Sequence, residues 1–252
     1  MNNNYSSIFY DGRHYDLRYS YLVEDIPFLL RQIERYGGPV LELACGTGRI
    51  AIPAALKGIA VVGMDFMESM LAVGKGKAQA QGANVEWVNA DCCDFSLGRK
   101  FSVIIFPFNS LSHITERKRI EQCFSCVQYH LKEDGVFILD YLNPKMELLL
   151  RDSLVRYPAS EYNDPDGKGK VVLTVSTNYD AAKQVNNVTW HYSIGNTSEE
   201  IDEELPMRIY FPQELDSLLE YNGFKILYKY GDYDESPFVS SSPKQLFICK
   251  AR

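Results

Sequence analysis

Residues 40–65 read VLELACGTGRIAIPAALKGIAVVGMD, and this stretch decides the fold class of the chain. It begins with a short apolar run and a glycine-rich turn, continues with a segment of helical periodicity at 50–58, and ends in a second apolar run at 60–65. Two buried strands joined by a helix form a βαβ unit, in which the strands lie parallel. The stretch therefore predicts a parallel sheet.

The same alternation of strand-like and helix-like segments continues as far as residue 140. Apolar, β-branched runs of strand length alternate with longer segments of helical periodicity. The predicted helices are 67–82 and 115–131, and the predicted strands are 85–91, 101–106 and 135–140. Together with the strands of the opening stretch, these segments predict a parallel sheet that is covered by helices on both faces.

The composition changes after Asn143 and Pro144. Over residues 170–211, the segments VVLTVSTNYD (171–180), VNNVTWHYSIG (185–195) and MRIYF (207–211) are rich in Val, Thr, Tyr and Trp and read as strands. DPDGKGK (164–170) precedes them and NTSEEIDEE (196–204) interrupts them, a pattern that is typical of an antiparallel meander. We interpret this region as an inserted β-lid. A helix at 212–223 and two strands, at 224–230 and 245–250, are predicted to complete the chain.

Acidic residues outnumber basic residues in this chain. With 33 Asp and Glu against 26 Lys and Arg, the formal net charge is −7. An acidic protein is poorly suited to neutralising many phosphates, so we expect no nucleic-acid partner and no membrane partner. The first residues contain no apolar signal region, and no stretch approaches the ~18 apolar residues of a membrane span, so we expect a cytoplasmic protein.

Six cysteines occur without the regular spacing of a disulfide framework, and we expect them to be reduced thiols that mostly fill the core. Cys123 and Cys126 form a CxxC pair in an apolar, helix-like setting with no second ligand pair, so no metal site is predicted. Cys45 lies in the glycine-rich turn. We interpret it as a small, polarizable side chain rather than a nucleophile.

Ligands of open parallel sheets bind beyond the carboxyl ends of the strands, where the strand order reverses. The segments that follow the first four predicted strands are 42–48, 65–67, 91–92 and 106–110. Gly46 and Gly48 would let a ligand approach the backbone of the first turn, and the amides at the following helix start offer donors. The alternative, that these glycines merely make a tight turn, stays open at this point.

An acid ends the second strand of the opening stretch. Asp65 is placed to accept hydrogen bonds from two vicinal ribose hydroxyls, and a site for NAD would have the same acid. The GxGxxG pattern of such sites is incomplete, however, because the run that starts at Gly46 reads GTGRIA. The turn therefore argues against a dinucleotide.

The motifs ELACGTG, Asp65, NAD ending at Asp91, and FPFNSLSHI resemble the successive motifs of class I S-adenosylmethionine-dependent methyltransferases. The resemblance is strong over about residues 38–144. In the tail, RIYFPQELDSLLEYNGFKI and GDYDESPF resemble the small-molecule branch, which includes amino-sugar N-methyltransferases and glycine N-methyltransferase-like enzymes. The resemblance implies an α/β, Rossmann-like, seven-stranded, mostly parallel sheet with helices on both faces, plus the inserted antiparallel β-lid.

The resemblance also implies how the chain is divided and what it binds. A single methyltransferase domain, 1–252, would consist of N-terminal cap helices at 1–37, a core at 38–144 that binds S-adenosylmethionine, an inserted helix and β-lid at 145–211, and a last helix with strands at 212–252. The implied cofactor residues are Ala44, Gly46 and Gly48 at the methionine moiety, Glu42, which would organise that loop, Asp65 at the ribose, Phe66 and Met67 beside the adenine, Asp91 and Cys92 at the adenine edge, and Phe106 under the methionine portion. For Asp91, a turn-capping role stays open.

The N-terminal segment SSIFYDGRHYDLRYSYL is dense in tyrosines. Similar enzymes fold such a segment over the cofactor, which implies a cofactor-binding role for Tyr10 and a catalytic role for Tyr15, with Tyr19 as a further candidate. The alternative is an amphipathic helix with an aromatic packing face.

The acceptor site is expected past the fourth strand and on the lid. Methyl transfer from a sulfonium is an in-line displacement, so it needs a positioned and deprotonated acceptor rather than a covalent intermediate. His113 is the best placed histidine and is predicted to be catalytic or to orient the substrate, although a structural role stays open. The predicted substrate contacts are Asn109, Trp190, Arg208, Tyr210 and Tyr233.

We expect an enzyme that transfers a methyl group from S-adenosylmethionine to a small-molecule metabolite, with nitrogen favoured over oxygen or sulfur. The alternatives are an NAD(P)-dependent oxidoreductase and a non-catalytic sensor that binds S-adenosylmethionine. An exposed edge of the lid could pair between subunits, so a homodimer stays open.

Overall fold

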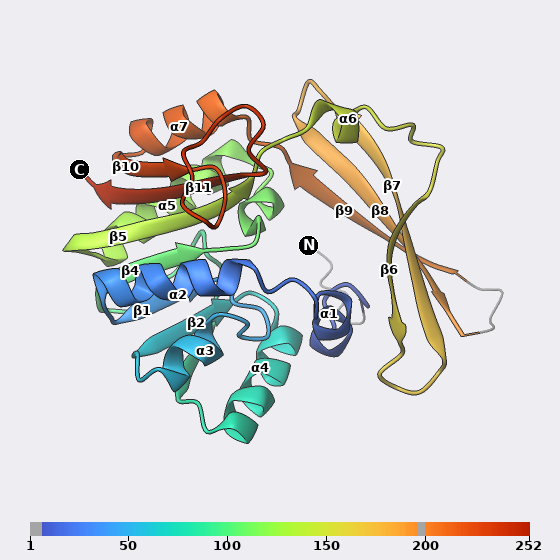
Figure 1. Cartoon of the computed structure of the whole chain (residues 1–252), viewed down its shortest axis with the longest axis horizontal. Coiled ribbons are helices and arrows are strands. Elements are labelled where there is room, and N and C mark those ends of the chain that lie inside the picture. The colour runs from blue at the N-terminus through green and yellow to red at the C-terminus, as the bar shows by residue number, and fades with distance from the viewer. Residues whose placement is uncertain (1–6, 196–199) are drawn as a thin grey trace.

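The computed structural model describes residues 7–195 and 200–252, which form a seven-stranded sheet and a separate four-stranded sheet (Figure 1). The larger sheet has the order β10-β11-β5-β4-β1-β2-β3, and β11 alone runs in the direction opposite to the other six strands. Its strands are β1 (Val40–Leu43), β2 (Val61–Asp65), β3 (Val85–Asn89), β4 (Phe101–Phe106), β5 (Leu131–Leu142), β10 (Phe224–Tyr230) and β11 (Lys244–Ala251). The predicted Rossmann-like, mostly parallel sheet is confirmed.

Apolar side chains on both faces explain why this sheet is central. Val103 of β4 is in register with Val40 of β1 and Val136 of β5, and all three pack in one core cluster. The residues that follow them along the strands, Leu41, Ile104 and Phe137, pack in the cluster on the other face. Because successive side chains of a strand point to opposite faces, both faces need helices to cover them.

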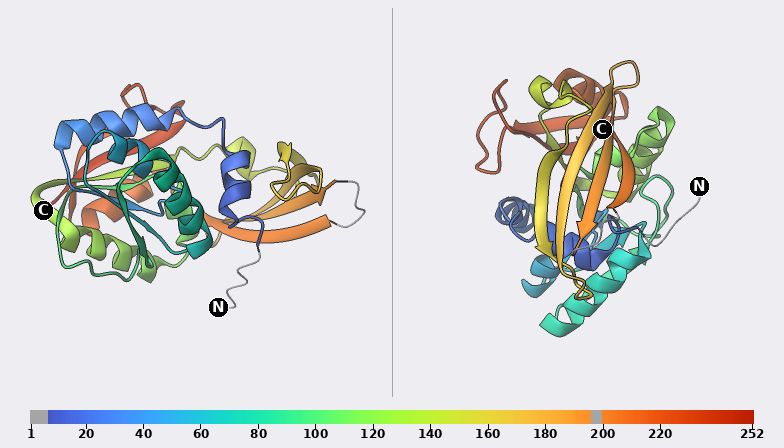
Figure 2. Two further views of the ribbon diagram at one scale, coloured as in Figure 1. Left: turned by 90° about the horizontal axis from the view of Figure 1, so that it is seen from below. Right: turned by 90° about the vertical axis from the view of Figure 1, so that its right-hand side faces the viewer.

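Helices cover both faces of this sheet (Figure 2). On one face lie α2 (Asp25–Tyr36), α3 (Ala51–Leu56) and α4 (Glu68–Gln81), and on the other lie α5 (Arg117–His130) and α7 (Pro212–Tyr221). Among residues 7–195 and 200–252, no helix has both the length and the apolar character needed to cross a membrane.

The smaller sheet is the predicted antiparallel lid, which stands beside the core (Figure 1). It is a meander of β6 (Tyr157–Asn163), β7 (Lys170–Asp180), β8 (Val185–Ile194) and β9 (Glu200–Arg208), reached from β5 through the short helix α6 (Met146–Leu149).

The lid boundaries differ from the prediction in three ways. β6 was not predicted, because its side chains are mostly exposed and its sequence, YPASEYN, lacks an apolar run. The acidic residues 200–204, interpreted from sequence as part of an interruption, belong to β9 and pair with β8. Conversely, the predicted strand at 207–211 ends at Arg208, after which Ile209 and Tyr210 are buried. Residues 196–199 of the predicted interruption lie outside the described part of the chain.

Helix α1 (Gly12–Arg18) lies between the core and the lid (Figure 1). It begins at Asp11, whose side chain accepts a hydrogen bond from the Arg13 amide as an N-cap. Arg18 is buried and donates to the Tyr192 hydroxyl of β8 at 2.6 Å, while Lys77 of α4 pairs with Asp16 at 2.7 Å. The N-terminal segment is therefore held by both the core and the lid, and it closes the space between them.

Candidate active site

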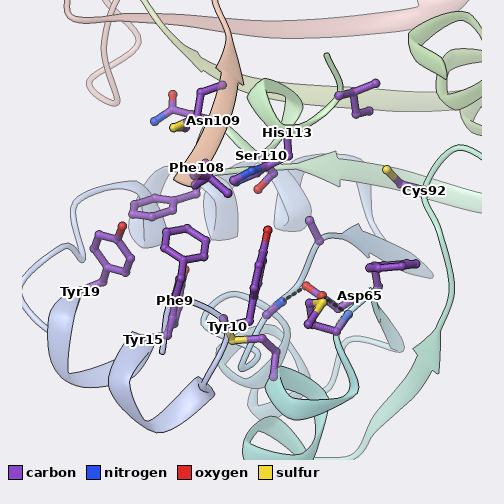
Figure 3. Close-up of a pocket in the computed structure, with 18 of the residues that line it drawn as sticks. Phe9, Tyr10, Tyr15, Tyr19, Asp65, Cys92, Phe108, Asn109, Ser110 and His113 are labelled. Atoms are coloured by element: carbon purple, nitrogen blue, oxygen red, sulfur yellow. Dashed lines mark hydrogen bonds between the residues drawn. The ribbon is translucent and has the colours of Figure 1, made fainter. Parts of the chain in front are cut away.

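A cavity of about 1050 Å³ lies between the carboxyl ends of the core strands, the N-terminal segment and the lid. The core contributes residues that follow β1, β2, β3 and β4, and the lid contributes residues of β8 and β9. Figure 3 shows Phe9, Tyr10, Tyr15 and Tyr19 of the N-terminal segment facing Phe108, Asn109, Ser110 and His113 of the segment after β4. The cavity thus lies where ligands of open parallel sheets bind.

The glycine-rich turn between β1 and α3 forms part of the floor. Ala44 and Gly46 line the cavity with φ values of 52° and 56°. A Cβ atom on Gly46 would meet nothing within 4 Å, so this glycine leaves room for a ligand. A Cβ atom on Gly48 would lie 2.5 Å from the Trp87 ring, so Gly48 is required by packing and does not line the cavity.

Asp65 lies at the end of β2 and joins the turn to the start of α4. One carboxylate oxygen accepts a hydrogen bond from the Gly46 amide at 2.7 Å, and the other accepts one from the Met67 amide at 2.8 Å (Figure 3). Burial raises the pKa of Asp65, although these amides oppose the shift. Each oxygen keeps a second lone pair, so the carboxylate can also accept hydrogen bonds from a vicinal diol.

Asp91 and Cys92 line the cavity just after β3. The Asp91 carboxylate accepts a hydrogen bond from the Cys93 amide at 2.8 Å and pairs with Arg119 at 2.5 Å. Burial favours the protonated acid, but these hydrogen bonds outweigh it, and the pKa of Asp91 is lowered. Asp91 is therefore a charged acceptor just after β3, which is separated from β1 and its turn by β2. Phe66 is half exposed and lines the cavity with Met67.

Glu42 lies behind the turn and does not line the cavity. It is 2 % exposed, and burial raises its pKa to about 8 despite the nearby Arg49 charge and the Ala51 amide. Within the described residues, one of its carboxylate oxygens has no hydrogen-bond partner. Arg49 donates instead to both oxygens of Asp25, at 2.6 and 2.5 Å. Glu42 can therefore affect a ligand in the cavity only indirectly, through the position of the turn.

Aromatic rings form one wall of the cavity. The Tyr19 ring contacts the Tyr15 ring at 5.0 Å and the Phe108 ring at 5.3 Å between centroids, and the Arg49 guanidinium lies 4.5 Å from the Phe108 centroid. Burial raises the pKa of Tyr15 above its ordinary value. The Tyr15 hydroxyl therefore stays protonated at neutral pH and can donate a hydrogen bond but cannot serve as a base.

His113 ends the short 3-10 helix η1 (Ser110–His113), and its side chain opens into the cavity. Surrounding protein lowers its pKa, so the imidazole is neutral at neutral pH. Its ring contacts Phe9 edge to face at 6.2 Å, and no hydrogen bond to it is found in the described part of the chain. A neutral imidazole with an unengaged nitrogen can accept a proton from a bound substrate.

The lid wall brings Trp190 of β8 and an acidic stretch of β9 to the cavity. Glu203 accepts hydrogen bonds from the Ile8 and Phe9 amides at 2.7 and 2.9 Å and from the Ser7 hydroxyl at 2.7 Å. The Trp190 ring packs against Phe9 at 5.2 Å. Glu203 therefore ties the N-terminal segment to the lid.

Two predicted substrate contacts do not line the cavity. Arg208 pairs with Glu214 of α7 at 2.9 Å, and Tyr210 is fully buried with its hydroxyl donating to the Ile114 carbonyl at 2.7 Å. The prediction placed both on a lid strand, but β9 ends at Arg208 and the chain then enters the core. These contacts are structural, so we do not retain either residue as a substrate contact.

Several lining residues were not singled out from the sequence. Asn109, Trp190 and Tyr233 line the cavity as expected. Among the lining residues missed are Phe9, Phe108, Glu203 and Lys244. Phe108 stands inside the quoted motif FPFNSLSHI and could have been found there, whereas Lys244 reaches the site only because β11 returns beside β5.

Comparison with known proteins finds sequence matches to the core of this chain. Residues 40–135 match the family described as "Methyltransferase domain". A "Putative methyltransferase" of Geobacillus sp. (strain WCH70) is 30 % identical over 132 residues, which are 50 % of this chain and 53 % of that protein. The dTDP-3-amino-3,6-dideoxy-alpha-D-glucopyranose N,N-dimethyltransferase of Streptomyces fradiae is 28 % identical over 116 residues, which are 46 % of this chain and 44 % of that protein. The chain thus spans about half the length of these two relatives.

The fold extends further than the sequence similarity. The crystal structure of an S-adenosylmethionine-dependent methyltransferase from Clostridium acetobutylicum covers 92 % of this chain and 96 % of its own, with a TM-score of 0.75 and 21 % identity. The resemblance to class I S-adenosylmethionine-dependent methyltransferases of the small-molecule branch is confirmed.

Proposed function

We propose that this chain, whose core matches the methyltransferase domain family, transfers a methyl group from S-adenosylmethionine to the nitrogen of a small-molecule amine. The observation that carries the proposal is the joint placement of Asp65, Asp91 and the open turn at Gly46 on the floor of one cavity. Two carboxylates at the ends of adjacent strands match the two polar ends of an adenosine, namely the ribose diol and the adenine amino group.

The residues present fit this cofactor. Asp65 would accept from the ribose hydroxyls, and Asp91 would accept from the adenine amino group beside Cys92. Phe66 and Met67 would flank the adenine. The open turn would take the methionine portion, with Ala44, Gly46, Phe106 and Tyr10 around it. When bound, S-adenosylmethionine supplies an electrophilic methyl group on a sulfonium whose leaving group departs as a neutral thioether.

No covalent intermediate is needed in this reaction. The task of the protein is to hold the acceptor in line with the methyl group and to remove a proton. Cys45 is buried, lies outside the cavity lining, and has a pKa raised by burial. It is therefore not the nucleophile.

The charges around the cavity favour a cationic amine as the acceptor. Among the described lining residues, the acidic ones are Glu24, Asp25, Asp65, Asp91, Asp202, Glu203 and Glu204, and the one Lys or Arg is Lys244. Lys244 is paired with Asp140 at 3.0 Å, as Asp25 is with Arg49 and Asp91 with Arg119, so the negative charge of the cavity rests on the other acidic residues of this list. An acidic cavity with aromatic walls attracts an ammonium group and disfavours a diphosphate.

An amine attacks only after it has lost its proton, and His113 is placed to accept it. The imidazole is neutral, because its pKa is lowered by the surrounding protein, and its ring opens into the cavity on the side of the post-β4 segment. The Tyr15 hydroxyl remains protonated, so it would orient the acceptor amine rather than remove its proton.

The test combines binding with turnover. Calorimetric titration should give one site for S-adenosylhomocysteine and none for NAD. A panel of small amines, phenols and thiols is then assayed with S-adenosylmethionine, and amines should be methylated. Binding of NAD without S-adenosylhomocysteine would refute the proposed cofactor, and methylation restricted to phenols or thiols would refute the amine.

A further inference from the structure

Three cysteine side chains meet behind the adenine end of the cavity. Cys92 and Cys93 follow β3, and Cys123 lies in α5. Their sulfur atoms all lie within 4.8 Å of one another, and those of Cys92 and Cys93 are 4.0 Å apart. The pair that stands out in the sequence is Cys123 with Cys126, but the fold brings together a different set, because α5 contacts the segment that follows β3.

The spacing of the three sulfur atoms is close to that of a metal thiolate site. With metal–sulfur distances of about 2.3 Å, three thiolates around one ion lie roughly 3.8–4.0 Å apart. The cluster therefore needs only small side-chain movements to surround an ion. Ions that prefer thiolates, such as Zn²⁺ and Cd²⁺, suit such a site better than Mg²⁺ or Ca²⁺.

The surroundings offer an entry path for an ion. Cys93 and Cys123 are 3 % and 0 % exposed, whereas Cys92 is partly exposed and lines the cavity. An ion can therefore enter from the cavity past Cys92. Arg119, one turn before Cys123 in α5, is already paired with Asp91 at this corner, so the positive charge that compensates the thiolates is that of the ion itself.

We propose that Cys92, Cys93 and Cys123 bind a thiophilic metal ion such as Zn²⁺, and that this ion and the adenine end of the cofactor exclude each other. On binding, each thiol releases its proton to solvent and its sulfur forms a bond to the ion, with no change of oxidation state. A fourth position, facing the cavity at Cys92, is left for water. The mutual exclusion of the ion and the cofactor rests on the proposed function, whereas the metal site itself does not depend on that function.

The exclusion follows from shared residues. Asp91, which is the acceptor proposed for the adenine amino group, directly precedes Cys92. Its carboxylate also accepts a hydrogen bond from the Cys93 amide. When the Cys92 and Cys93 thiolates move to bind an ion, the conformation of the loop that carries Asp91 changes as well. By linkage, the metal must then weaken cofactor binding by the same factor as the cofactor weakens metal binding.

The metal site is tested on the full chain without cofactor, in a non-thiol reductant that prevents disulfides. Titration with Cd²⁺ should produce an ultraviolet sulfur-to-metal charge-transfer band that saturates at one ion per chain and disappears with a chelator. Cys93→Ser and Cys123→Ala should lose the band. Cys126→Ser is the matched control, because Cys126 lies on the same helix outside the cluster, and it should keep the band.

Each result decides one claim. Equal Cd²⁺ binding by the parent chain and by folded Cys123→Ala or Cys93→Ser, checked by circular dichroism, overturns the metal site, as does a parent chain without the band. With one equivalent of Zn²⁺, the Kd for S-adenosylhomocysteine should rise at least about tenfold in the parent chain and stay unchanged in Cys93→Ser. An unchanged Kd in the parent chain overturns the exclusion, whereas no S-adenosylhomocysteine binding without metal overturns the proposed function.

Discussion

The two sheets differ in what holds their residues in place. Every residue of β1 is buried between helices, and β4 is buried along almost its whole length, whereas most residues of β6 and β9 are partly or fully exposed. The core presents its ligand groups at strand ends, where the backbone fixes them. The lid presents side chains that depend on contacts with the N-terminal segment. We therefore expect changes in the core to act on the cofactor and changes in the lid to act on the acceptor.

His113 gives the largest expected effect, because it lies between the two regions on the segment after β4. Its removal deletes the base without touching the floor that would hold the cofactor. We expect His113→Ala to lower kcat by about 100-fold or more, in keeping with the usual size of general base catalysis. The Kd for S-adenosylhomocysteine, measured by calorimetry, should stay within about twofold of the parent value.

The pH dependence provides the control for this prediction. The pKa of His113 is lowered from the ordinary 6.5, so the imidazole is the active base above that lowered pKa and is lost as the pH falls through it. In the parent chain, kcat should therefore begin to fall only below pH 6.5. In His113→Ala this acid limb should be absent. A parent profile that falls well above pH 6.5 would assign the limb to another group.

Asp65 is the strongest test of the core. Asp65→Ala removes a carboxylate that accepts the Gly46 and Met67 amides and, in the proposed complex, two ribose hydroxyls. We expect cofactor affinity to fall by about 2 kcal/mol, or roughly 30-fold, as charge-assisted hydrogen bonds are lost. Calorimetry with S-adenosylhomocysteine measures the change.

Asp94→Ala is the matched control for Asp65. Asp94 follows β3 but is exposed and does not line the cavity, so its loss should leave cofactor affinity unchanged. If Asp65→Ala binds S-adenosylhomocysteine as tightly as Asp94→Ala does, Asp65 does not hold the ribose.

The same difference explains how far the sequence could be interpreted. Alternating apolar runs and helical periods predict the core strands, because the central strands β1, β2 and β4 are buried along almost their whole length and leave a local signal. Strand ends then place Asp65 and Asp91 without knowledge of side-chain contacts. Glu203 leaves no such signal in the sequence. Its role depends on hydrogen bonds from the Ile8 and Phe9 amides, which are nearly two hundred residues away in sequence.

Glu203 tests the lid. Glu203→Gln keeps the size of the side chain but replaces one acceptor oxygen with an amino group, which faces amide or hydroxyl donors of the N-terminal segment. Loosening that segment disturbs the wall formed by Phe9. We expect the KM for the acceptor to rise about tenfold, as charged hydrogen bonds of 1.5–3 kcal/mol are partly lost. The Kd for S-adenosylhomocysteine should change less than about threefold.

Glu200→Gln, on the same strand, separates this effect from a general loss of lid charge. Glu200 pairs with Arg156 on the outside of the lid and does not line the cavity. It should leave the KM unchanged. An equal rise of KM in both variants would mean that Glu203 acts only through the net charge of the lid.

Tyr210 should have the smallest effect on catalysis, because it belongs to the core although the sequence pattern placed it on the lid. Tyr210→Phe removes the hydroxyl that donates to the Ile114 carbonyl and leaves that buried acceptor unpaired. We expect the free energy of unfolding, from urea denaturation, to fall by about 1–2 kcal/mol, while kcat and KM stay within about twofold. Tyr221→Phe, at a side chain 90 % exposed, should change neither quantity. A higher acceptor KM in Tyr210→Phe without loss of stability would instead place this hydroxyl in contact with the substrate, and the boundary between core and lid would have to move past Arg208.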